Sequence, residues 1–281
     1  MTNARTLAFR YLTPKIQLDQ DSLSPAQIMA KSFHFVCSSE RCISLVKGIM
    51  HKRGRLWAPS EGSREDREPA LMVWEPVPEL CIPEQRAKFK EAVQYVDIVS
   101  PNAEELAGFF TSEIPVWSEE KAAKEVLAWG IGSHGNGILV TRQGSKGCAA
   151  YLRERQFHLR AYHLSTEDQQ STVVDPTGGG NAFLGALALA MNGKVTPSMS
   201  ILHKLLVEVE PHGQLLGALI YATIAASFVI EQPGMPMLSQ NGREKELWNG
   251  ELFEDRLVTY LHREHDYITQ QFVSNEDSVS S

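Results

Sequence analysis

The stretch VVDPTGGGNAF, residues 173–183, constrains the fold more than any other part of the chain. Two valines before Asp175 are typical of the end of a strand, and the apolar stretch 182–191 is typical of a buried helix. Three consecutive glycines (178–180) separate the two. The first N–H groups of a helix have no intrahelical partner and lie at its positive end, and glycines let an anion approach them. The stretch therefore predicts either an anion-binding turn or a tight turn that needs positive φ.

The composition is that of an ordinary globular protein. The 281 residues are 43% hydrophobic and 22% charged, which is sufficient for a buried core in one large domain. A net charge of −7 without a basic run argues against nucleic-acid binding, and no apolar stretch approaches the roughly 20 residues of a membrane span. The start lacks the apolar segment of a secretory signal, and the alternation of Leu7, Phe9 and Tyr11 favours a strand over a transit peptide. We therefore expect a cytoplasmic protein without nucleic-acid or membrane partners.

Apolar runs alternate with amphipathic runs through the first half of the chain, which predicts a parallel sheet covered by helices. Strands are expected at residues 33–37, 70–74, 97–100 and 137–141, with helices between them and a polar loop at 54–70. Ser118 and Gly130 are the expected cap and stop of one helix. Residues 148–152 and 156–163 are expected to form an antiparallel pair at the sheet edge, and 274–281 a disordered tail.

Three unusual stretches follow predicted strands: PNAEE, TRQGSKG and DPTGGGN, at residues 101–105, 141–147 and 175–181. Ligands bind outside the carboxyl ends of the strands in an open parallel sheet, so we expect these stretches to meet there. Taken alone, PNAEE favours a helix cap, because Asn102 followed three residues later by Glu105 forms a capping box. TRQGSKG taken alone is a glycine turn between strands.

The order of the three motifs resembles that of the ribokinase-like (pfkB) family of small-molecule kinases. It runs Asn-x-x-Glu, then Thr-x-x-Gly-x-x-Gly after a strand, then Asp-x-Thr-Gly-x-Gly before a buried helix. Residues 74–85 and the alanine-rich stretch 218–236 are also similar to family segments. The similarity is greatest to the fungal maintenance-of-killer branch. The resemblance implies an α/β, three-layer fold with a mostly parallel sheet.

For the phosphate end of the site, the resemblance implies an anion hole and a metal site. Gly178, Gly179, Gly180 and the backbone of the next residue would receive the γ-phosphoryl oxygens of ATP. Asn102 and Glu105 would hold Mg²⁺ together with its waters. Phosphoryl transfer depends on such positioning and charge neutralisation more than on covalent chemistry.

The resemblance further implies a nucleotide pocket and a cation site. The residues it places beside the nucleotide are Thr141, Gly144, Ala222, Ala226 and Gly234. In family members that use a monovalent cation, that cation would lie at the positions of Asp175 and Thr177.

Two features depart from the family pattern. Family members have an aspartate, the base for the substrate hydroxyl, where this chain has Asn181, and an amide cannot take that proton. The early di-glycine that grips the sugar-like substrate is also missing, so we expect a domain over residues 1–273 with an incomplete amino-terminal portion that lacks the first βαβ region. Such a domain would expose apolar surface, which predicts a homodimer or a stabilising partner.

The functional hypothesis is an ATP-dependent phosphotransferase that acts on a sugar or sugar-like alcohol. Because Asn181 occupies the base position, a catalytically weak, nucleotide-binding pseudokinase or regulatory protein is the alternative. A truncated gene fragment is a third hypothesis.

Overall fold

The fold is built on one mixed sheet, seen in a computed structural model that describes residues 17–57, 69–110, 117–164, 172–240, 242 and 245–273. Within these residues the sheet has six strands in the order β1-β2-β3-β4-β5-β6. They are β1 (Ser32–Cys37), β2 (Leu71–Pro76), β3 (Ile98–Val99), β4 (Ile138–Arg142), β5 (Cys148–Tyr151) and β6 (Gln156–Leu159). β1 to β4 are mutually parallel, and β5 and β6 continue the sheet antiparallel. The predicted parallel sheet with an antiparallel edge pair is confirmed.

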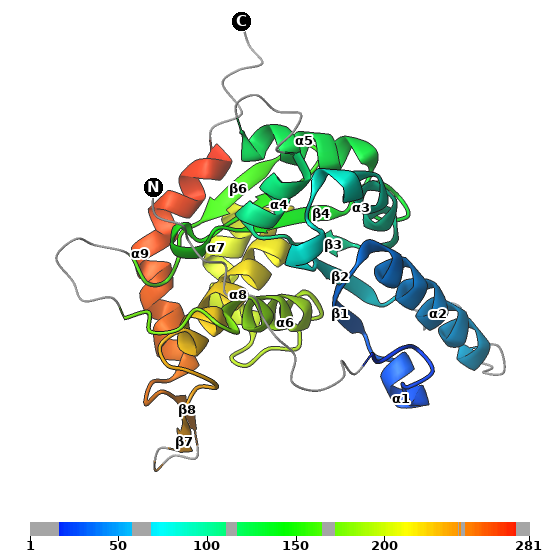
Figure 1. The fold of residues 1–281 in the computed structure, drawn as a ribbon. Coiled ribbons are helices and arrows are strands. Elements are labelled where there is room, and N and C mark those ends of the chain that lie inside the picture. Colours follow the sequence, from blue (N-terminus) through cyan, green and yellow to red (C-terminus); the bar gives the residue numbers. More distant parts are fainter. Residues whose placement is uncertain are drawn as a thin grey trace, which may run out of the picture.

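Helices cover both faces of the sheet and make three layers (Figure 1). One face carries α2 (Ser39–Trp57), α3 (Arg86–Ala92), α4 (Ala103–Phe110) and α5 (Glu119–Trp129). The other carries α6 (Gly179–Met191), α7 (His203–Glu208), α8 (Gly213–Val229) and α9 (Phe253–Val273). The smaller elements are helix α1 (Pro25–Ile28), the hairpin of β7 (Leu238–Gln240) and β8 (Glu246–Trp248), and the 3₁₀ turns Pro78–Leu80, Pro83–Gln85, Val93–Tyr95, Gly144–Lys146 and Met199–Leu202.

The inner strands β2 to β5 contribute to both cores, because successive side chains point to opposite faces of a sheet. Val73 and Val140 pack among the residues of α6 and α8, whereas Trp74 and Leu139 pack against α2 to α5. On the side of α2 to α5, Phe89 is fully buried and stacks on Phe109 with ring centroids 4.2 Å apart. Helix α8 is buried around nearly its whole circumference, as expected for a helix that is apolar on all sides.

Several predicted boundaries shift. Helix α2 continues to Trp57, so residues 54–57 are helical rather than part of the predicted loop, and the strand predicted over 156–163 ends at Leu159. Ser118 caps α5 by accepting from the Lys121 N–H at 3.3 Å, and Gly130 ends it, as predicted. The predicted strand at residues 7–11 and the tail at 274–281 lie outside the described residues.

The strand predicted to lead into the glycines is wrong over the part that the structure describes. Residues 172–174 form no strand. Instead the N–H groups of Val174 and Asp175 both donate to the carbonyl of Ile230, at 2.9 and 3.2 Å. The glycine turn is therefore anchored to the end of α8 rather than to the sheet.

Among the described helices, none is long and apolar enough to span a bilayer.

Candidate functional site

The three sequence motifs meet at one cavity, which lies at the carboxyl ends of the parallel strands. Its volume is about 780 Å³, within the range of small-molecule sites. Asn102 follows β3, Gly144 and Gly147 follow β4, and Gly179 and Gly180 begin α6, and all five line the cavity. The expectation that these stretches would converge is confirmed.

The start of α6 offers backbone donors to this cavity. Gly178 is the residue before the helix and has φ +87°, a left-handed conformation that favours glycine. The Gly179 N–H donates to the Pro176 carbonyl at 3.2 Å, whereas those of Gly180 and Asn181 donate to no backbone carbonyl of the described residues. Two N–H groups at the positive end of a helix are thus available to an anion.

Close packing also explains why the next two residues are glycines. A Cβ on Gly179 would come within 2.8 Å of the Ile230 side chain, and a Cβ on Gly180 would overlap the guanidinium of Arg142. Positive φ at Gly178 and close contact at Gly179 and Gly180 therefore account for the glycine run.

Asn102 and Glu105 form the capping box that the sequence predicts. Asn102 accepts the Glu105 N–H at 2.8 Å, and Glu105 Oε2 accepts the Asn102 N–H at 2.7 Å. The Glu105 side chain is buried, and burial raises its pKa despite the Asn102 N–H and the nearby Arg142, which lower it. Both residues are therefore engaged in holding the start of α4.

Glu105 belongs to a largely buried cluster of ionisable side chains, which consists of His34, Glu75, Glu105 and Arg142. Nη2 of Arg142 lies 2.8 Å from Glu75 Oε1 and 3.3 Å from Glu105 Oε2, and donates to the Ser100 carbonyl at 3.2 Å. His34 Nε2 lies 3.4 Å from Glu75 Oε2. Sequence reasoning missed this cluster. The sequence feature that could have revealed it is Arg142, a charged residue at the end of a buried strand and within the TRQGSKG stretch.

Thr141 and Arg142 point to opposite faces of the sheet. Thr141 is fully buried on the side of α5, where its hydroxyl donates to Glu119. Arg142 instead faces α6 and lines the cavity. Of the five residues predicted beside the nucleotide, Gly144 and Ala226 line the cavity, whereas Thr141, Ala222 and Gly234 do not.

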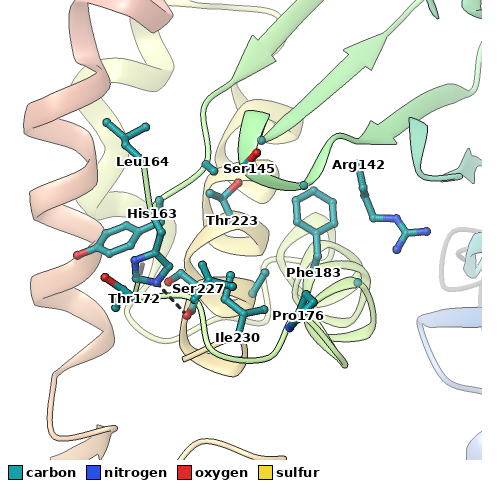
Figure 2. A pocket seen from close by; sticks show the side chains of 18 of the residues that line it. Arg142, Ser145, His163, Leu164, Thr172, Pro176, Phe183, Thr223, Ser227 and Ile230 are labelled. Carbon is teal, nitrogen blue, oxygen red and sulfur yellow. Dashed lines mark hydrogen bonds between the residues drawn. The ribbon is translucent and has the colours of Figure 1, made fainter. Parts of the chain in front are cut away.

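The far end of the cavity is lined by both apolar and polar side chains, and Arg263 is one of them. Figure 2 shows His163 and Arg142 on opposite sides of Phe183. His163 Nε2 lies 3.2 Å from the Ser227 carbonyl and 3.2 Å from Glu231 Oε1. Burial lowers the pKa of His163, which favours the neutral ring. The sequence did not single out this wall, because residues 161–164 follow β6 in a stretch without a motif.

Comparison with known proteins identifies the family. The sequence profile of the pfkB family carbohydrate kinases matches residues 72–236, which is more than half of the chain. This chain belongs to the pfkB family. It is 32% identical over 272 residues to an uncharacterized protein of Schizosaccharomyces pombe, covering 90% of this chain and 65% of that protein. It is also 32% identical over 270 residues to the protein MAK32 of Saccharomyces cerevisiae, covering 90% and 64%. The predicted fungal maintenance-of-killer branch is confirmed.

Solved structures agree with the pfkB assignment. A protein from E. coli described as a ribokinase II, in complex with ATP and Mg²⁺, matches with a TM-score of 0.50 and 17% identity over 88% of this chain and 63% of that chain. An adenosine kinase from Sinorhizobium meliloti matches with a TM-score of 0.51 and 15% identity over 78% and 54%. At these identities the likeness shows the fold, which is ribokinase-like as predicted. The pfkB chain described here spans 65% and 64% of the two fungal relatives.

Asn181, which the family resemblance predicts to lie at the base position, is exposed in the first turn of α6 and is not part of the cavity wall. Asp175 and Thr177, which the resemblance predicts to lie at a cation position, form a local turn in which Asp175 Oδ1 accepts the Thr177 N–H at 2.9 Å. Hydrogen bonds from Thr177 hold the pKa of Asp175 below its usual range. The roles that the pfkB resemblance implies for these three residues stay predictions.

Proposed function

We propose that this pfkB-family protein binds ATP in the cavity and transfers its γ-phosphoryl group slowly or not at all. The observation that carries the proposal is the start of α6. There Gly180, whose N–H group is free, lines a cavity of about 780 Å³ that is large enough for a nucleotide, and the free N–H group of Asn181 follows in the same helical turn.

The two ends of the cavity suggest the orientation of the nucleotide. Phosphates carry the charge, so they would lie at the donor-rich start of α6, beside Gly180 and Gly144. The base would lie between the wall that contains His163 and Tyr162 and the α8 residue Ala226. Aromatic and apolar walls with a few polar groups are typical of base-binding pockets.

Asn102 and Glu105, the proposed magnesium residues, do not fit a directly coordinated ion. Asn102 Oδ1 and Glu105 Oε2 already accept backbone N–H groups, and the Arg142 guanidinium lies 3.3 Å from Oε2. Mg²⁺ demands near-octahedral oxygen ligands, and the positive charge of Arg142 next to the Glu105 carboxylate would repel an ion bound there. The described residues contain no group of three or more metal-ligating side chains. In this proposal the two residues would contact Mg²⁺ only through its water ligands.

The weak-transfer part of the proposal rests on Asn181. An amide can position a substrate hydroxyl but cannot remove its proton at neutral pH. Backbone N–H groups form the proposed anion hole, so the amide leaves phosphate binding intact. This combination favours the nucleotide-binding pseudokinase over the efficient kinase. A sugar-like alcohol as acceptor, and a monovalent cation at Asp175 and Thr177, are further proposals taken from the family.

Calorimetry of ATP binding tests the proposal. The parent protein should bind ATP, and Ala226→Phe should abolish binding because a ring at this position fills the cavity. Leu189→Phe is the matched control, since it adds a ring at an exposed site of α6 that does not line the cavity. Thermal unfolding of all three proteins checks that they fold. Absence of ATP binding to the parent at millimolar concentration would overturn the proposal.

A further inference from the structure

Arg142 is placed at the phosphate end of the cavity by contacts on both sides of its guanidinium. One side is held by the carboxylates of Glu75 and Glu105, 2.8 and 3.3 Å from Nη2. The other side lies directly against Gly180, where any Cβ would overlap Nη1. The charge is therefore fixed beside Gly180, at the start of α6.

The hydrogen-bonding capacity of this guanidinium is only partly used. The hydrogen bonds and ion pairs that the Arg142 side chain makes to described residues all involve Nη2. Nε is buried and has no hydrogen-bond partner, and Nη1 makes none of these bonds. A buried donor without a partner is unfavourable unless a ligand or water satisfies it. A guanidinium with free donors is well suited to phosphate oxygens, because its N–H groups match their geometry.

The same guanidinium disfavours a divalent cation at Glu105. It lies 3.3 Å from the carboxylate oxygen that such an ion would have to share. We propose that Arg142 binds the terminal phosphates of the nucleotide and supplies the positive charge that a divalent cation would otherwise bring, so that nucleotide binding persists without Mg²⁺. This inference rests on the proposed function, since it concerns the phosphate end of the same cavity.

The two carboxylates orient Arg142 in this role. Glu75 and Glu105 come from the ends of β2 and the start of α4, and both contact Nη2. With Nη2 held in this way, Nη1 lies against Gly180. A lysine at position 142 would keep the charge but not the several donors in fixed geometry.

The test is ATP binding by calorimetry, with Mg²⁺ and with EDTA in place of Mg²⁺. The parent should bind ATP in EDTA with a Kd within about tenfold of its Kd in Mg²⁺, since charge-assisted hydrogen bonds contribute about that factor or more. Arg142→Met should weaken binding in EDTA by about tenfold or more, and Mg²⁺ should recover part of the loss because Glu105 is then free of the guanidinium. The Kd of Arg142→Lys for ATP in EDTA should lie between those of the parent and Arg142→Met.

Arg153→Met is the matched control, because Arg153 is exposed and does not line the cavity. It should bind ATP like the parent in both buffers. ATP binding in Mg²⁺ with none in EDTA would overturn the role of Arg142 and leave the proposed function intact. Equal Kd values for the parent and Arg142→Met in EDTA would do the same. Absence of ATP binding in both buffers would overturn both proposals. Arg142→Lys keeps the ion pairs, so it preserves the test if Arg142→Met does not fold.

Discussion

Asn102 and Glu105 hold each other's backbone: the Glu105 N–H donates to Asn102 Oδ1 at 2.8 Å, and the Asn102 N–H donates to Glu105 Oε2 at 2.7 Å. This reciprocal pair satisfies two N–H groups at the start of α4. Asn102 also lines the cavity, so the cap fixes one wall of the proposed nucleotide site.

Replacing the cap should destabilise the protein. Asn102→Ala is expected to lower the free energy of unfolding by about 1 kcal/mol, because the Glu105 N–H loses its acceptor. Glu104→Gln, at an exposed position in the same turn, should change it by less than about 0.5 kcal/mol. Urea denaturation of the three proteins measures both values. Equal stability of Asn102→Ala and the parent would show that the cap contributes nothing.

The buried aromatic cluster of Trp74, Phe89 and Phe109 should contribute strongly to the free energy of unfolding. Phe89 is fully buried, with its ring centroid 4.2 Å from that of Phe109 and 5.6 Å from that of Trp74. Phe89→Ala should lower the free energy of unfolding by about 3–5 kcal/mol, since it removes buried apolar area and leaves a cavity. Leu189→Ala, at a half-exposed position of α6, is the control and should lose far less. Chemical denaturation compares them, and equal losses would contradict the assignment of Phe89 to the core.

Much of the fold could be predicted from local patterns. Alternating strands and amphipathic helices gave the parallel sheet, and Ser118 and Gly130 marked the ends of α5. The strand predicted before Asp175 does not form over residues 172–174, because two backbone N–H groups donate to the Ile230 carbonyl instead. That contact joins segments more than 50 positions apart, which no local pattern reveals.

The site was predicted by its motifs but not by its charges. The three motif stretches converge as expected. The resemblance predicts Thr141 beside the nucleotide, but it is the next residue, Arg142, that lines the cavity. Since side chains alternate along a strand, Thr141 and Arg142 must face opposite sides of the sheet. Which of the two sides contains the cavity depends on where α6 packs, and this follows from tertiary structure alone.

Acidification should weaken the contribution of Glu75 to stability. Burial alone would raise the pKa of Glu75, but its contacts with His34 and Arg142 outweigh burial and hold the pKa below its usual value of 4.5. A carboxyl with a lowered pKa in the folded state stabilises the protein above about pH 4.5, and this stabilisation is lost as the pH falls through the folded-state pKa. Glu75→Gln should therefore cost most at neutral pH and progressively less below about pH 4.5.

The measurement needs a background in which Glu105 does not titrate, because Glu75 helps to raise the pKa of Glu105. Both proteins would carry Glu105→Gln, and urea denaturation would be followed from pH 7 down through the acid range. A stability difference that stays constant over this range would contradict the depressed pKa of Glu75.

Asn181→Asp should increase ATP turnover, because it restores a proton acceptor at the first turn of α6 with almost no change in volume. Loss of a general base typically costs about 10²–10⁴-fold in rate, so a gain of at least about tenfold in ATP hydrolysis is expected even with water as the acceptor. The added charge lies beside the free N–H groups of α6 and should weaken ATP binding slightly. Calorimetry and a phosphate-release assay measure the two effects.

The control for this prediction is Asn136→Asp, which introduces the same change at an exposed position before the amino end of β4, the opposite end from the cavity. It should leave both ATP binding and turnover unchanged. If the parent already transfers phosphate at the rates of ordinary kinases, on the order of 1–100 per second, and Asn181→Asp changes nothing, then Asn181 does not stand in for a base. If Asn181→Asp abolishes ATP binding while Asn136→Asp does not, the start of α6 binds an anion, but the added carboxylate lies too close to it for catalysis.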